Sequence, residues 1–219
     1  MSKLLRTENR SPGRGRRWQR GLLTLALALL AGLSGAMAQM QPSWVRKDEP
    51  VTGEREPALR KIDWQKDTLA RDRINYYRYR LPQELRRQNN FAWARADIPG
   101  LHKKEYYAHS RIQSLDSLSS RNAKRISGIS PKPDPKEARF KTIMVDYLGN
   151  IGGPNAIPRW FDTEYKIMED IASRLPDTSV EGHIQLFTNL EPCRSCWGVM
   201  KQFMAVYTNI EIEVLFSWP

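Results

Sequence analysis

Two cysteines near the C-terminal end are the residues of this chain best suited to chemistry. Cys193 and Cys196 are its only cysteines and follow Pro192, at the start of a segment whose apolar residues have helical spacing. A Cys-x-x-Cys pair on the first turn of a helix directs both sulfurs to one side, where they can share a tetrahedral metal ion. The free amides of that turn also favour the thiolate over the thiol. The pair therefore predicts two of the ligands of a zinc site.

A third ligand and a proton-transfer group are expected at Asp162-Thr163-Glu164, at the start of the preceding helical segment. Glu164 falls in the middle of an apolar stripe, where a carboxylate needs a partner or a function. General acid/base catalysis is one explanation, and a structural bond to a buried amide or arginine is the other. Asp162 can reach the metal only from the first turn, where an aspartate is also an ordinary N-cap. Spacing alone favours neither role for Asp162.

His109 is the alternative third ligand. It lies towards the end of a predicted strand, from which hairpin residues could approach both helix N-termini. A histidine with two thiolates leaves a zinc site formally neutral, whereas Asp162 gives it a net negative charge and raises the pKa of the bound water. A lone strand histidine, however, more often forms hydrogen bonds or contacts a substrate.

Three uses of the cysteines compete with metal binding. They are a disulfide in an oxidising compartment, two small buried hydrophobes, and a thioredoxin-like redox pair. The surrounding elements lack the thioredoxin order, and Trp197 follows the pair instead of preceding it. Metal binding is therefore the favoured interpretation.

The elements that must position these residues alternate between strands and helices. The spacing of apolar residues predicts strands over 91–98, 104–113, 140–148, 183–188 and 210–216, and helices over 81–88, 160–175 and 192–207. The last strand–helix–strand unit predicts a right-handed crossover between parallel strands. The sequence therefore predicts an α/β fold with helices packed on a mixed sheet.

The ends of the chain suggest export and one working domain. Residues 1–38 combine a basic stretch, an apolar run too short to span a membrane comfortably, and a small-residue exit, which indicates a cleaved signal peptide. Residues 39–80 are charged and contain prolines, and are expected to be a linker or prosegment. Residues 81–219 form the predicted domain, with an exposed Ser/Pro/Lys-rich insertion at about 114–136.

The net charge of the chain is +11, but part of it belongs to the signal peptide. Residues 1–38 hold seven Lys and Arg and one acidic residue, so the remaining 28 basic and 23 acidic residues carry a net charge of +5. This excess is compatible with a polyanionic partner, although scattered surface lysines and arginines are the more common explanation.

Several short motifs follow one another along the domain: Tyr107-Ala108-His109-Ser110, Asp162-Thr163-Glu164-Tyr165-Lys166-Ile167, Leu186-Phe187-Thr188, Glu191-Pro192-Cys193-x-x-Cys196 and Gly198-Val199-x-x-Gln202-Phe203. With these motifs, the segment from about residue 90 to residue 216 resembles a toxin-deaminase family of bacterial polymorphic toxins. That family lies within the cytidine-deaminase-like superfamily, whose signature is H-x-E…P-C-x-x-C. The resemblance implies a cytidine-deaminase-like three-layer α/β fold.

The resemblance also implies roles for individual residues. Asp162, Cys193 and Cys196 would bind Zn²⁺, Glu164 would act as general acid/base, and His109 and Ser110 would contact the substrate. The implied activity is hydrolytic removal of an exocyclic amine from cytosine or adenine, in a nucleic acid or nucleotide.

The implied biology is that of a toxin or effector. The protein would be secreted or periplasmic, without stable membrane insertion once the signal is removed, with delivery to a target cell and a neutralising immunity protein as further expectations. Two alternatives stay open from the sequence: a non-catalytic exported binding domain with this fold, and a periplasmic thiol oxidoreductase.

Overall fold

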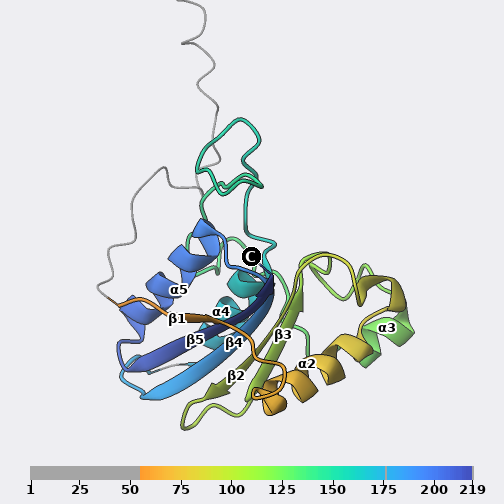
Figure 1. Ribbon diagram of the computed structural model, residues 1–219, viewed down its shortest axis with the longest axis horizontal. Helices are drawn as coiled ribbons and strands as arrows, with labels where there is room; N and C mark the ends of the chain where they lie inside the picture. The colour runs from red at the N-terminus through yellow and green to blue at the C-terminus, as the bar shows by residue number, and fades with distance from the viewer. Residues whose placement is uncertain (1–54, 176, 219) are drawn as a thin grey trace, which may run out of the picture. The chain divides into compact units, whose positions relative to one another are not determined.

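A five-stranded mixed sheet forms the centre of the molecule, in the strand order β1-β5-β4-β2-β3. The computed structural model describes residues 55–175 and 177–218, and these contain the strands β1 (Ala58–Lys61), β2 (Phe91–Asp97), β3 (Glu105–His109), β4 (Gly182–Leu190) and β5 (Ile210–Trp218) (Figure 1). Strand β5 pairs in parallel with both β1 and β4, whereas β2 is antiparallel to β4 and β3. Residues 1–38, the expected signal peptide, lie outside the described residues.

Helices cover both faces of this sheet and give it three layers. Helix α2 (Thr68–Arg80) packs on one face, and α4 (Thr163–Ala172) and α5 (Arg194–Val206) pack on the other (Figure 1). A short helix α3 (Ser120–Arg125) and a 3₁₀ turn (Gln83–Leu85) complete the elements. The predicted α/β class with helices on a mixed sheet is confirmed. Among the described residues, no helix has the length and apolar character required to cross a bilayer.

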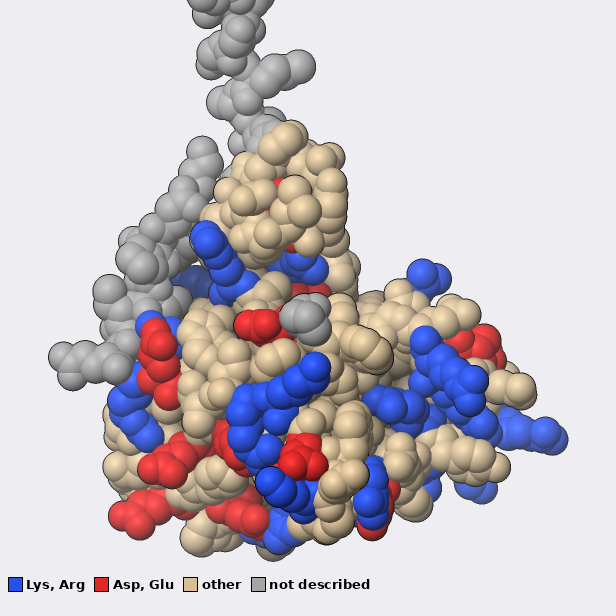
Figure 2. All heavy atoms as spheres, viewed as in Figure 1, with Lys and Arg blue, Asp and Glu red and all other residues tan. Residues whose placement is uncertain are grey.

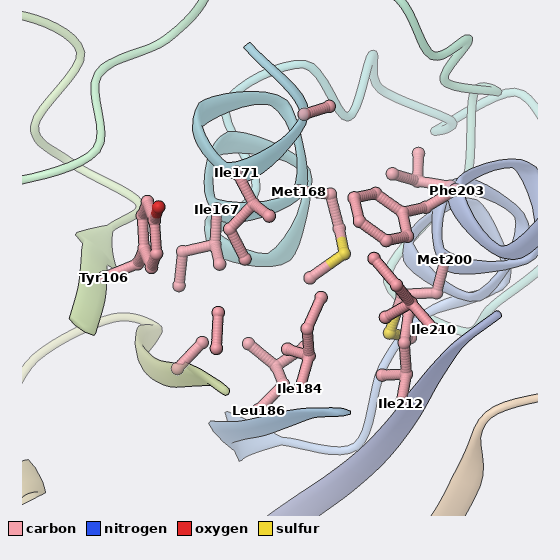
Figure 3. Packing of buried hydrophobic residues seen from close by; sticks show 14 of the residues in the cluster. Tyr106, Ile167, Met168, Ile171, Ile184, Leu186, Met200, Phe203, Ile210 and Ile212 are labelled. Atoms are coloured by element: carbon pink, nitrogen blue, oxygen red, sulfur yellow. The ribbon is translucent and has the colours of Figure 1, made fainter. Parts of the chain in front are cut away.

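Alternation along the strands divides the apolar residues into two cores, as expected for a sheet covered on both faces. On the α4 side, Ile184 and Leu186 of β4 meet Ile167 and Met168 of α4 and Phe203 of α5 (Figure 3). The other core lies under α2 and contains these buried side chains: Ile74, Phe91, Trp93, Tyr107, Phe187 and Leu215.

The predicted hairpin, helix α4 and the β4–α5–β5 unit are all present at close to their predicted ranges. The pairing of β4 with β2 requires a close approach at Gly182, the first residue of β4. A Cβ atom there would lie 2.7 Å from Cγ1 of Ile98 and 2.8 Å from the carbonyl oxygen of Asp97. Glycine therefore lets β4 begin directly against the end of β2.

The predicted strand over 140–148 is wrong, because side chains of the helices satisfy the main chain of this segment. The carboxylate of Glu169 accepts a hydrogen bond from the Phe140 amide at 2.8 Å, and the Ser195 hydroxyl accepts one from the Ile143 amide at 3.1 Å. Because the amides of Phe140 and Ile143 donate to side chains of α4 and α5, they are not available to pair with a strand, and the segment does not join the sheet.

Residues 55–80 contribute to the fold, although we expected the whole of 39–80 to be a linker or prosegment; residues 39–54 lie outside the described residues. Within the described range, β1 pairs with β5, and α2 buries Ala70 and Ile74 in the second core. Charged and exposed residues occupy most of the other positions of α2, so its apolar periodicity was too sparse to reveal the helix. The helix predicted over 81–88 is only the 3₁₀ turn.

The insertion at 114–136 is also more ordered than expected. It contains α3, and its residues Ile126 and Ile129 are buried in the core under α2. Its Ser130 donates a hydrogen bond to the Asp170 carboxylate at 2.7 Å, and Lys103 forms an ion pair with the same group at 2.7 Å. Asp170 therefore joins α4 to two loops.

We predict that Ile74→Ala lowers the free energy of unfolding by about 2–5 kcal/mol, because it leaves a cavity where α2 meets the sheet. Leu69→Ala on the same helix is the control. Leu69 is 51% exposed, and its truncation should change the free energy by less than about 0.5 kcal/mol. Urea unfolding measures both values. Equal effects of the two changes would contradict the packing of α2 as part of the domain.

We predict that Asp170→Asn lowers the free energy of unfolding by about 3 kcal/mol at neutral pH, because Lys103 then lacks its partner. Burial raises the pKa of Asp170, but hydrogen bonds from Lys103, Ser130 and Arg174 outweigh it and leave the pKa below its ordinary value. The stabilisation is therefore present above the unfolded-state pKa and is lost as the pH falls through the folded-state pKa. Urea unfolding of parent and variant at about pH 7 and about pH 3 tests this. An undiminished difference at the lower pH would contradict it.

Candidate active site

Several chain segments converge at one edge of the sheet, where β4 ends. Pro192 leads from β4 into α5, whose N-cap residue is Cys193, and α4 begins immediately after Asp162. Strand β2 is antiparallel to β4 and pairs Ala92 with Thr188. Asn90, the residue just before β2, therefore lies at the same edge of the sheet. The N-termini of two helices are thereby brought to the carboxyl end of a strand.

Asp162, Cys193 and Cys196 form a compact group whose three potential ligand atoms all lie within 4.8 Å of one another. The Oδ2 atom of Asp162 is 3.2 Å from the sulfur of Cys196 and 3.5 Å from that of Cys193. The two sulfurs are 3.2 Å apart and both thiols are free. The structure thus combines the two cysteines with the aspartate.

Asp162 occupies the N-cap position of α4 but does not cap the helix with its side chain. Its carboxylate is directed at the two thiols, and its Oδ1 atom lies 3.8 Å from the Arg159 guanidinium. Of the two roles that spacing left open, the geometry therefore supports that of a ligand.

His109, the last residue of β3, is fully buried. Its Nε2 atom is 3.1 Å from the carbonyl oxygen of Leu85 and 3.0 Å from that of Gln88, while Nδ1 accepts a hydrogen bond from the Arg111 amide. Burial lowers the pKa of His109, which favours the neutral ring. Main-chain groups thus use both ring nitrogens, so the structure gives His109 a supporting role and not that of the third ligand.

Ser110, the second residue expected to contact the substrate, packs against the start of β2. Its hydroxyl accepts a hydrogen bond from the Asn90 amide at 3.2 Å, and its own amide donates to the Asn90 carbonyl at 3.0 Å. Ser110 therefore fixes the position of Asn90.

Glu164 is almost completely buried, and its side chain is 2% exposed within the core of the site. The hydroxyls of Thr163 and Thr188 each donate a hydrogen bond to its carboxylate at 2.8 Å. Its Oε2 atom lies 3.6 Å from the sulfur of Cys196. Among the described contacts, its hydrogen-bond donors are neutral groups and not the arginine or backbone amide that a structural role would use. The carboxylate is thus held rigidly beside the ligand group.

Asn90 is a site residue that sequence analysis missed. Its amide nitrogen donates to the hydroxyl of Thr163 at 2.8 Å and to that of Thr188 at 3.0 Å, and it lies 3.4 Å from Oε1 of Glu164. It thus braces both hydroxyls that hold the catalytic candidate. A single asparagine in a turn forms no periodic pattern, so only the antiparallel pairing of β2 with β4 reveals it.

Burial and neighbouring groups disfavour the ionised forms of Asp162 and Cys196. Burial raises the pKa of Asp162 to about 6, with a further contribution from Glu164 and an opposing one from Arg159. A hydrogen bond with Cys193 and burial raise the pKa of Cys196 well above its ordinary value. A divalent cation would offset these effects, and two thiolates with one carboxylate fit the three protein ligands of a catalytic zinc site.

A cavity of about 350 Å³ lies next to the start of α4. Phe140, Trp160 and Tyr165 contribute aromatic walls, and Lys132 and Lys141 stand among the lining residues. The Lys132 ammonium is 4.1 Å from the centre of the Trp160 ring. The cavity thus combines flat apolar surfaces with positive charge, and its lining includes Tyr165, the residue that follows Glu164, but none of the three candidate ligands.

Comparison with known proteins identifies the family. The model of the toxin-deaminase family, described as the BURPS668_1122 family of deaminases, matches residues 74–217. The chain belongs to this family. The matched range contains every residue of the candidate site and excludes β1. No curated protein and no solved structure matches the chain.

Membership of the toxin-deaminase family gives the geometry a chemical context. Deamination requires an activated water and a group that transfers its protons. The ligand group and the adjacent Glu164 carboxylate are the parts of this domain that meet those two requirements.

We predict that the folded toxin-deaminase domain binds about one zinc ion per chain, and that Cys193→Ser, Cys196→Ser and Asp162→Ala each lose it, because three protein ligands are needed for a catalytic site. Metal analysis of the purified, reduced variants measures this. The control is His109→Gln, which should keep the metal because its ring bonds only to the main chain. Retention of zinc by Asp162→Ala together with its loss in His109→Gln would transfer the ligand role to β3.

Proposed function

We propose that this protein is a zinc-dependent nucleobase deaminase, which hydrolytically removes an exocyclic amine from cytosine or adenine in a nucleic acid or nucleotide. The observation that carries the proposal is the position of Glu164. Its buried carboxylate lies 3.6 Å from the sulfur of Cys196, a candidate zinc ligand, and accepts hydrogen bonds from neutral hydroxyls. The chain also belongs to the toxin-deaminase family.

Asp162, Cys193 and Cys196 would hold the zinc ion. When bound, zinc acts as a Lewis acid that makes a water molecule nucleophilic at neutral pH. Glu164 accepts one proton from the attacking water and delivers it to the ring nitrogen. It then takes the remaining hydroxyl proton, as the carbonyl forms, and delivers it to the amine, which leaves as ammonia when the C–N bond breaks. The hydroxyls of Thr163 and Thr188 keep the carboxylate oriented during both transfers.

The aromatic cavity beside α4 supports a planar substrate. Trp160 and Tyr165 offer stacking surfaces, and Lys132 can neutralise a nearby phosphate. A nucleobase with its attached phosphate has both the flat apolar faces and the negative charge that this lining complements. A simple amide or amine substrate would use neither.

We further propose a secreted toxin or effector role, with delivery to a target cell. The signal-like pattern of residues 1–38 and the family's association with toxins support it. An enzyme that alters nucleobases would endanger the cell that makes it, so a neutralising immunity protein is part of this proposal.

We predict that Glu164→Gln folds and binds zinc like the parent but loses deamination by at least about a hundredfold, because glutamine keeps the shape and cannot transfer a proton. The measurement is base conversion, read by sequencing of DNA and RNA incubated with the protein, together with ammonia release from nucleotides. Metal content and unfolding curves establish that the variant is folded.

Glu169→Gln is the matched control for this experiment. Glu169 is also a buried carboxylate of α4, but it accepts hydrogen bonds from the main chain at Phe140 and lies outside the ligand group. Its replacement should lower stability and leave the activity per folded molecule unchanged. Full activity of Glu164→Gln, or a zinc-bound parent that converts no base, would favour the non-catalytic alternative.

A further inference from the structure

The second half of α2 and the turn that follows it present alternating arginine and tyrosine side chains, which we call the arginine–tyrosine surface: Arg78, Tyr79, Arg80, Arg86 and Arg87. Tyr79 is 72% exposed, and the Arg86 guanidinium lies 4.4 Å from the centre of its ring. Figure 2 shows Lys and Arg side chains gathered over the region of α2 and α3. The surface is thus both positively charged and aromatic.

This surface continues into a cavity of about 460 Å³ at the end of β4, lined mainly by Arg78, Arg86, Arg87, Asn89, Asn189 and Trp218. Three arginines and no carboxylate stand among its lining residues. Trp218 is 67% exposed there. Arginine, asparagine and an exposed aromatic ring are the side chains that contact phosphates, sugars and unpaired bases.

Arg78 is the residue that most clearly lacks an anion. One guanidinium nitrogen donates to Oδ1 of Asn189 at 2.7 Å, whereas its Nε atom is buried without a hydrogen-bond partner. Within the described part of the chain, no carboxylate lies within ion-pair distance of Arg78, Arg86 or Arg87. By contrast, Arg73, five residues earlier on the same helix, pairs with Glu105. The cavity therefore collects cations that the fold itself does not neutralise.

The cavity and the candidate active site share two chain segments. Asn189 follows Thr188, and Asn89 precedes Asn90, so each segment gives one residue to the cavity and the next to the network that holds Glu164. Because successive side chains of a strand point to opposite faces, the two sites lie on opposite faces of the same sheet edge. The cavity is thus one residue along the chain from the network that holds Glu164.

We propose that the arginine–tyrosine surface and the adjoining cavity bind the backbone and unpaired bases of a single-stranded nucleic acid. This inference rests on the proposed deaminase function and names its substrate as a polynucleotide. Arginines contact the phosphates in bidentate fashion. Tyr79 and Trp218 stack on bases that only an unpaired strand exposes. A free nucleotide seated beside Glu164 would leave this surface unused.

The test measures binding with the zinc-loaded Glu164→Gln protein, in which the strand is not consumed. The probe is a fluorescent single strand of about 16 nucleotides, and anisotropy is recorded over a range of salt concentrations. Tyr79→Ala should weaken binding about fivefold or more, as expected for loss of one stacked base. Arg87→Ala should lower the slope of log affinity against log salt by about 0.7, the value for one phosphate contact on a single strand.

Arg95→Ala is the matched control. Arg95 is also a partly exposed arginine, but it lies towards the other end of β2 and pairs with Asp97, so its removal should change neither affinity nor slope. Arg87→Lys keeps the charge and should retain the slope. Because Tyr79 and Arg87 are exposed, circular dichroism should show that all four variants are folded.

The two proposals fail in different ways. Parent-like binding by both Tyr79→Ala and Arg87→Ala, or equal affinity for a duplex and a single strand, would overturn the proposed surface even if the parent deaminates DNA or RNA. Conversely, the expected losses of binding together with a zinc-bound parent that converts no base would leave the surface standing and remove the deaminase function.

Discussion

The burial of α4 is the constraint on which the surrounding structure depends. All ten of its residues are buried, yet four of them carry charge, and a buried charge must be satisfied from within the protein. Glu169 is satisfied by the main chain of the segment after residue 138, and Asp170 by Lys103 and Ser130. The polar positions of one helix therefore decide where several irregular segments lie.

Lys166 shows the same principle next to the site. Its ammonium donates hydrogen bonds to the carbonyls of His109 at 3.0 Å and Ile112 at 2.7 Å, at the end of β3. Burial lowers the pKa of Lys166 to about 7. The turn that positions Ser110, and through it Asn90, is thereby attached to the helix that carries Glu164. Glu164 and the residues that support it are consequently both attached to α4.

The parts of this molecule that sequence reasoning could predict are those with a local pattern. The alternation of Ala92, Ala94 and Ala96 revealed β2, and the spacing of apolar residues located α4, α5 and the adjacent strands. Glu164 was noticeable because a charge interrupted an apolar stripe. The family resemblance then favoured Asp162, whose spacing alone was ambiguous, and its side chain does lie against both thiols.

The misses are those in which tertiary contacts replaced a local signal. The segment after residue 138 has strand-like composition, but Glu169 and Ser195 use the amides that a sheet would need. Helix α2 has only two buried residues, Ala70 and Ile74, too few for a recognisable periodicity. His109 resembled a ligand in the sequence, whereas in the structure its Nε2 atom bonds to main-chain carbonyl groups of the turn at 85–88. None of these relationships connects residues close enough in sequence to be recognised from it.

The separation of the candidate ligands along the chain has a consequence for when this protein can act. Asp162 stands about thirty residues before the cysteines, and only the packing of α4 against α5 brings the three side chains together. An unfolded chain has no such site, so metal affinity and folding stability are linked quantities. In the export that we propose, a chain that crosses a membrane in unfolded form would therefore have no metal site. It would become competent only where it can both fold and find a metal ion.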